Sequence, residues 1–143
     1  MTIQQWCFSF RGRLGRRDFW LGMVFVLVLM AVLFVLADIG WLETQKAAFA
    51  LVVLMWPLAA MLVKRLHDRD RKGSWALLLI VAWMLGSGNW AMLPALVQWL
   101  VERFIPVLIA VMMLLECGLL AGTSGANRFG AHSEPLRLRN SER

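Results

Sequence analysis

Long runs without charge constrain the fold of this chain more than any other feature. The run from Phe19 to Ala37, FWLGMVFVLVLMAVLFVLA, contains no charged residue. It is long enough for the helix of about 20 residues that crosses a bilayer core. A soluble helix needs a polar face, and such a run has none. With 60% hydrophobic and 17% charged residues, against about half and a quarter in soluble domains, the sequence predicts an all-α integral membrane protein. The run is too long for a signal peptide and lacks a cleavage site.

Four apolar segments predict a small bundle of about four transmembrane helices. We expect them near residues 19–37, 47–63, 74–97 and 104–121, within a membrane domain of residues 1–132. A polar tail at 133–143 follows and is expected to be disordered. The third segment is ambiguous, because no charge occurs from Gly73 to Val101 while GSGN interrupts it at 86–89. It fits one tilted helix, a helix broken at the glycines, or a helix followed by an interfacial segment.

The basic residues are distributed unevenly between the two ends of these helices. Of the 15 Lys and Arg residues, only Lys46 and Arg103 fall in the connections after the first and third helices. The others precede the first helix, lie between the second and third, or follow the fourth. The positive-inside rule therefore predicts four crossings with both termini cytoplasmic. The surplus charge is expected to face anionic lipids rather than nucleic acid.

Few residues have the spacing of a catalytic or metal site. Cys7 and Cys117 belong to no metal-binding pattern, so we expect free thiols, no metal and no cofactor. His67 and Asp68 are adjacent, a spacing that seldom lets two side chains cooperate, so no catalytic residue and no enzyme activity is predicted. Glu116 interrupts the last apolar run. It is either a proton or cation site inside the bundle or an acid that pairs with a basic loop at the interface.

Three polar segments carry a family resemblance. They are FSFRGRLGRRDFW at 8–20, KRLHDRDRKGSW at 64–75 and GTSGANRFG at 122–130. In this order they resemble the motifs of the domain of unknown function 805 family, the YhaH-like bacterial inner-membrane proteins. Asp70 stands where the family usually has glycine. The resemblance implies a multi-pass protein of the inner membrane, and it implies no mechanism, because the family's biochemical role is not established.

The matched residues form the candidate site, and all of it is expected at the cytoplasmic face. Its members are Gly12, Arg13, Arg16, Arg65, His67, Asp68, Arg71, Gly73, Asn127 and Arg128. One interpretation is a structural clasp in which Asp68 pairs with Arg13, Arg16 or Arg128. The other is a site for an anionic ligand or lipid head group, with the glycines allowing close backbone approach.

Three functions are compatible with these patterns. The first is a non-enzymatic membrane scaffold or modulator that binds a partner protein or forms a homo-oligomer. The second is a small transporter or channel component, for which Glu116 is the only intramembrane charge. The third is a protein that binds anionic lipid head groups through its basic face.

Overall fold

The described part of the chain, residues 2–133 and 135 of a computed structural model, is built from helices. It contains no β-strand, and Asn127 and Gly130 form only an isolated bridge. The predicted all-α class is therefore confirmed.

The first pair of helices comprises α2, Arg16–Asp38, and α3, Thr44–Asp68. They run antiparallel, joined by a short turn in which Gly40 has a φ of 78°. Both are long and apolar enough to cross a membrane, yet only 17% of the most apolar window of each is buried. A core helix of a soluble protein would bury most of that surface, so these helices present apolar side chains to their surroundings.

The second pair is interrupted where the glycines occur. The 3₁₀ turn η1, Gly73–Ala76, leads into α4, Leu77–Ser87. After an irregular connection, four segments follow one another without a break: α5, Ala95–Trp99; η2, Leu100–Phe104; α6, Ile105–Leu114; and η3, Leu115–Leu119. Segments η2 and η3 are π-helical.

The predicted boundaries of the third and fourth helices were wrong. The third was expected to end at 97 and ends at Ser87, because Gly88 adopts an extended conformation. The fourth was expected to begin at 104 and begins at Ala95, after Pro94. Its charged residues do not end the helix, since the Gln98 amide nitrogen donates to the Glu102 carboxylate one turn away at 3.0 Å.

The first two helices instead extend beyond the predicted spans at their basic ends, to Arg16 and Asp68. Most of the predicted tail at 133–143 lies outside the described residues.

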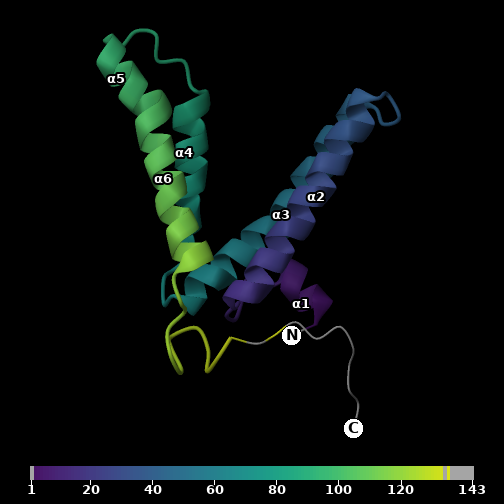
Figure 1. The fold of residues 1–143 in the computed structure, drawn as a ribbon, viewed down its shortest axis with the longest axis vertical. Helices are drawn as coiled ribbons and strands as arrows, with labels where there is room; N and C mark the ends of the chain where they lie inside the picture. The colour runs from purple at the N-terminus through teal and green to yellow at the C-terminus, as the bar shows by residue number, and fades with distance from the viewer. Residues whose placement is uncertain (1, 134, 136–143) are drawn as a thin grey trace.

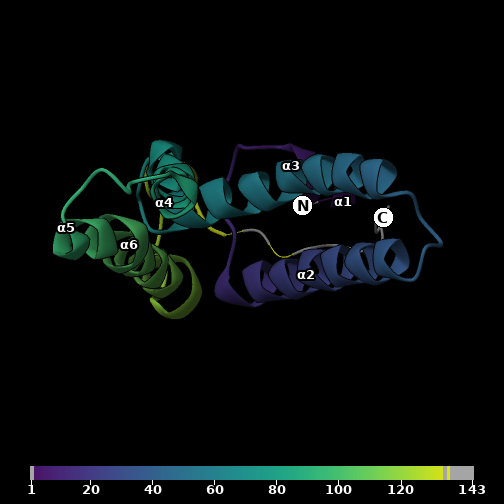
Figure 2. The ribbon, with the colours of Figure 1, turned by 90° about the horizontal axis from the view of Figure 1, so that it is seen from above.

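The two helix pairs diverge from a common base, which also holds α1, Ile3–Phe8, and the segment after η3 (Figure 1). Seen from above, α2 and α3 lie together and α4 and α6 lie together (Figure 2). Among the described residues, the backbone of the second pair comes close to α2 and α3 at η1 and η3, and Met113 of α6 belongs to the same buried core as Val26 and Met61. The polar motifs therefore meet where the pairs are joined.

Helix α1 packs closely against the first pair. A Cβ on Gly22 of α2 would overlap the indole of Trp6 and the sulfur of Met61. The glycine thus makes room for the Trp6 side chain, which is 8% exposed.

Candidate functional site: a polar clasp at the base

Asp68, the last residue of α3, is the centre of a buried ionic cluster. Its carboxylate accepts from Arg13 Nε at 3.0 Å and from Arg65 Nη1 at 2.5 Å. The three side chains are at most 5% exposed. Burial this complete requires pairing, because an isolated charge out of water costs several kcal/mol. Asp68 therefore joins the segment before α2 to the end of α3.

Arg13 also reaches the segment after η3. Its two terminal nitrogens donate to the carbonyl oxygens of Thr123, at 2.7 Å, and Gly125, at 2.5 Å. Longer bonds reach the carbonyls of Gly130 and Ala131. One planar guanidinium, with five donors in a fixed geometry, thus binds both Asp68 and the loop more than a hundred residues away.

The backbone carbonyls at the end of η3 are bound by three arginines and one tryptophan. Five successive carbonyls, from Cys117 to Ala121, accept hydrogen bonds from side chains: Arg65 binds Cys117 and Leu120, Trp20 binds Gly118, Arg16 binds Leu119 and Arg69 binds Ala121. The last carbonyls of a helix lack internal partners and carry partial negative charge. The arginines of the base therefore neutralise the end of the fourth helical segment.

The loop 122–130 is held to the end of α3 by hydrogen bonds to two backbone carbonyls of that helix. Thr123 donates its amide to the Asp68 carbonyl at 2.8 Å, and its hydroxyl lies 3.1 Å from the same oxygen. Asn127 donates its side-chain amide to the His67 carbonyl at 2.9 Å. We call Arg13, Arg65, Asp68, Thr123 and Asn127 the base clasp.

Gly122 lies directly against the Asp68 carboxylate. A Cβ at this position would overlap both carboxylate oxygens. Any other residue at 122 would displace Asp68 from its arginines, so the close approach requires glycine.

His67 faces away from the Asp68 cluster. Its ring stacks on Phe129 with centroids 3.9 Å apart, and Nδ1 lies 3.2 Å from the Gly12 carbonyl. Gly12 has a φ of 95°, a conformation suited to glycine. A Cβ on Gly73 would press against Val63 of α3. These residues shape the chain around the clasp, and His67 does not join Asp68 as a catalytic pair.

The remaining predicted residues lie around the clasp. Arg128 donates to the Asp70 carboxylate at 3.1 Å, and this exposed hydrogen bond holds the pKa of Asp70 below its ordinary value. Glu116 pairs with Arg69 at 3.1 Å and Arg71 at 3.8 Å, with a side chain 24% exposed. These contacts favour the interfacial interpretation of Glu116.

Lys64 is a member of the base that sequence reasoning missed. It is fully buried, and its ammonium donates to the carbonyls of Gln5 and Trp6, at the end of α1. It was treated only as one of the charges that orient the chain. Spacing could have identified it, because Met61, Lys64, Arg65 and Asp68 occupy one face of a helix.

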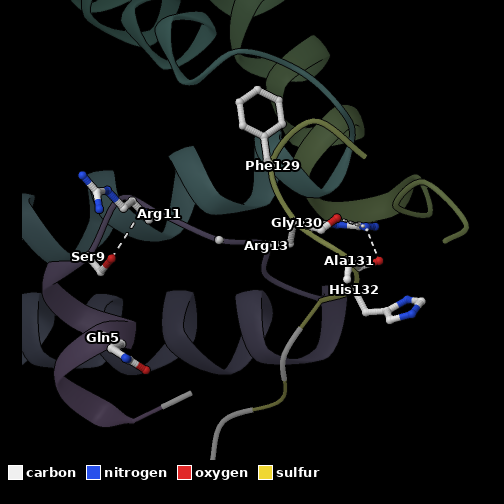
Figure 3. A pocket seen from close by; sticks show the side chains of 9 residues that line it. Gln5, Ser9, Arg11, Arg13, Phe129, Gly130, Ala131 and His132 are labelled. Atoms are coloured by element: carbon white, nitrogen blue, oxygen red, sulfur yellow. Dashed lines mark hydrogen bonds between the residues drawn. The ribbon is translucent and has the colours of Figure 1, made fainter. Parts of the chain in front are cut away.

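A cavity of about 510 Å³ beside the clasp has polar side chains at its rim (Figure 3). Arg11 and His132 point in different directions, and Arg13 is turned toward the Gly130 and Ala131 carbonyls. The side chains therefore do not converge on a ligand. Within the described residues, no group of three His, Cys, Asp or Glu side chains could hold a metal ion.

Comparison with known proteins agrees with the motifs that form the base. A family model described as a protein of unknown function (DUF805) matches residues 7–131. The chain belongs to the DUF805 family.

Its relatives in this family include three from Escherichia coli K12. It is 55% identical to "Uncharacterized protein YiiR" over 139 residues, covering 97% of this chain and 95% of the relative. It is 30% identical to "Inner membrane protein YhaI", with coverage of 85% and 83%, and 29% identical to "Inner membrane protein YhaH", with coverage of 85% and 84%. No solved structure matches. The base clasp thus lies inside the DUF805 region of the chain.

Proposed function

We propose that this DUF805 protein is a multi-pass protein of the bacterial inner membrane with four crossings and a cytoplasmic base. One observation carries the proposal: the three motifs meet at the base where the helix pairs join (Figure 1), whereas Lys46 lies in the first turn of α3, beside the turn that joins α2 to α3, and Arg103 lies in η2. The positive-inside rule then assigns the base, with both chain ends, to the cytoplasm. The relatives YhaI and YhaH are named inner membrane proteins, which supports an inner-membrane location.

Helix lengths are compatible with four crossings. At 1.5 Å per residue, α2 and α3 are roughly 34 and 37 Å long, and the continuous segment 95–119 is also roughly 37 Å. These exceed the hydrocarbon thickness of about 30 Å. The helical stretch from Gly73 to Ser87 is roughly 22 Å, so the uncharged connection 88–94 would complete the third crossing.

We further propose a non-enzymatic role as a membrane scaffold or modulator that acts through a partner protein or a homo-oligomer. The donors of Arg13 and Arg65 are directed to Asp68 and to backbone carbonyls, which makes the clasp a structural element. His67 and Asp68 bind different partners. A base that carries surplus positive charge and no catalytic pair favours a role in binding a partner over a role in catalysis.

Anionic lipid binding is the second candidate. Arg11 and Arg17 make no side-chain hydrogen bond or ion pair among the described residues, and Lys72 also adds charge beside the clasp. Free cations at a membrane surface attract anionic head groups. Transport has less support, because Glu116 is engaged by two arginines.

Reporter fusions test the topology. Green fluorescent protein fluoresces in the cytoplasm and alkaline phosphatase is active outside it, so a fusion after the last residue should fluoresce and lack phosphatase activity. Fusion in the turn between α2 and α3, after Glu43, is the matched control and should give the opposite pattern. Phosphatase activity at the C-terminus would refute the four-crossing topology.

The scaffold role has a separate test. The full chain is purified in a mild detergent, and its mass and bound components are determined by native mass spectrometry and proteomics. A reproducible partner or a defined oligomer is expected. A strictly monomeric protein without a partner would count against a scaffold.

A further inference from the structure

Two adjacent charges of opposite sign lie on the fourth helical segment, far from the base. That helix was expected to begin after Arg103, but it begins at Ala95, so Glu102 and Arg103 lie inside it, in η2. The helical stretch starts with α5, at the end of the second pair that is farthest from the base (Figure 1). An open hollow of about 430 Å³ is lined by residues at the spacing of one helix face: Ala95, Gln98, Trp99, Glu102 and Arg103.

Neither charge is neutralised within the part of the chain that the structure describes. Arg103 is exposed and has no hydrogen bond or ion pair there, and Glu102 accepts a hydrogen bond from the neutral Gln98 amide at 3.0 Å. The two side chains do not pair with each other, because consecutive residues of a helix do not face each other.

The depth of these charges makes a missing partner costly. At 1.5 Å per residue, Arg103 lies roughly 20 Å from Glu116 at the base. In a hydrocarbon core of about 30 Å, both charges then lie inside the apolar region, roughly 10 Å from its outer surface. Charged side chains at such a depth usually pair with one another or face the interior of a bundle.

A partner that covers the hollow must carry charge of both signs. An anionic head group would attract Arg103 but would be repelled by the Glu102 carboxylate, which lines the same hollow. A cation would be repelled by Arg103 for the same reason. A second copy of the chain carries an acid and a base in the same order and at the same depth, so it is complementary to this hollow in charge.

We propose that two copies of the chain dimerise through this face, with Arg103 of each copy paired to Glu102 of the other. A two-fold axis along the membrane normal keeps both copies in one orientation and brings the same patch of each together. Glu102 and Arg103 differ by about 100° around the helix. An axis that faces the direction between them therefore places each acid opposite the base of the other copy. The dimer specifies the homo-oligomer of the proposed scaffold role, and it rests on the proposed four-crossing topology.

Crosslinking tests which face of the helix meets the second copy. Ala95 lines the hollow, whereas Val97, at nearly the same depth, does not, because two residues further along a helix the side chain points about 200° away. With a short thiol-reactive crosslinker in vesicles, Ala95→Cys should give a covalent dimer and Val97→Cys should not. The wild type gives the background from Cys7 and Cys117. Equal crosslinking of the two variants would overturn the assigned face.

Charge exchange tests the pairing itself. Glu102→Arg copies carry two bases at this face and Arg103→Glu copies carry two acids, so each variant alone should lose the dimer. A mixture of the two variants should form a mixed dimer, because both pairs are then opposite in charge. Lys46→Glu is the matched control, since Lys46 pairs with Glu43 of its own chain at 3.4 Å, and it should leave the dimer unchanged.

The measurement is energy transfer between fluorescent proteins fused to the C-terminus of the full chain, in vesicles of phosphatidylglycerol and phosphatidylcholine. Arg103→Gln removes both ion pairs of the dimer. If each pair contributes about ten-fold to the dissociation constant, this variant should weaken the dimer about 100-fold. A mixture of the charge-exchanged variants that transfers no more energy than either variant alone would overturn the proposal. Loss of bound anionic lipid in Arg103→Gln with the dimer intact would also overturn it and would assign Arg103 to a head group.

The failure of this interface can be told apart from the failure of the proposed function. A wild-type dimer that is insensitive to every change at Glu102 and Arg103 refutes this interface and leaves the homo-oligomer standing. A monomeric wild type refutes the interface too, whereas binding of another protein is decided by the proteomic test. The reporter fusions decide the topology independently of both results.

Discussion

Replacing Asp68 by alanine should strongly destabilise the folded protein. The substitution removes one carboxylate and leaves the guanidinium groups of Arg13 and Arg65, which are 3% and 0% exposed, without their counter-charge. Each hydrogen bond between charged groups contributes about 1.5–3 kcal/mol, and breaking a buried ion pair costs about 3–5 kcal/mol. Both arginines keep their hydrogen bonds to backbone carbonyls. We therefore expect a destabilisation of about 3–5 kcal/mol, the cost of breaking one buried ion pair rather than two.

That loss is large beside a typical folding stability of about 5–15 kcal/mol. The assay is thermal and denaturant unfolding of the detergent-solubilised protein, followed by tryptophan fluorescence and size-exclusion chromatography. Asp70→Asn is the matched control: it removes a neighbouring carboxylate that pairs with exposed Arg128, and asparagine tolerates the φ of 56° at this position. If Asp68→Ala and Asp70→Asn unfold alike, the carboxylate of Asp68 does not hold the base together.

Three further outcomes are expected from the same contacts. Gly122→Ala should cost about 1–3 kcal/mol, because its methyl group displaces the Asp68 carboxylate; Gly15→Ala, which meets only ordinary contacts, is the control in the same unfolding assay. Glu116→Gln should cost no more than about 1 kcal/mol, since its ion pairs are partly exposed; a larger loss would mean that Glu116 belongs to the clasp. The hydrogen bond from Arg128 lowers the pKa of Asp70 from 3.8. The stability that this bond adds is therefore fully present above pH 3.8 and is lost as the pH falls through the lowered pKa. Arg128→Gln should remove this loss of stability at low pH, measured as the melting temperature at a series of pH values.

The convergence of the motifs was the most predictable part of the site. The distribution of Lys and Arg along the sequence predicts that the segments of Arg13, Asp68 and Asn127 lie on one side of the membrane. It was also expected that Asp68 pairs with an arginine. The sequence left three candidates for that arginine. The structure brings Arg13 to Asp68, while Arg16 binds the Leu119 carbonyl and Arg128 binds Asp70.

The roles of Lys64 and Gly122 could not be predicted in the same way. Lys64 is buried because α1 folds back onto α3 and presents its terminal carbonyls, a contact between segments far apart in sequence. Gly122 matters because of one close approach to Asp68, which no local pattern encodes.

The predicted helix boundaries were wrong where a charged residue was taken to mark the end of a helix. Glu102 and Arg103 lie within a continuous helical stretch, because long polar side chains can reach the interface and Glu102 has a local partner in Gln98. The break at Gly88 was among the alternatives, and the extended backbone there decides it.

A double-mutant cycle between Arg13 and Asp68 tests the central claim most directly. Unfolding free energies of Arg13→Gln, Asp68→Asn and the double variant are compared with the wild type under one detergent condition. If the two side chains hold the base together, the double variant should lose less stability than the two single variants combined, by about 1–3 kcal/mol. Additive losses would contradict the account, because they would mean that Arg13 and Asp68 contribute to stability independently.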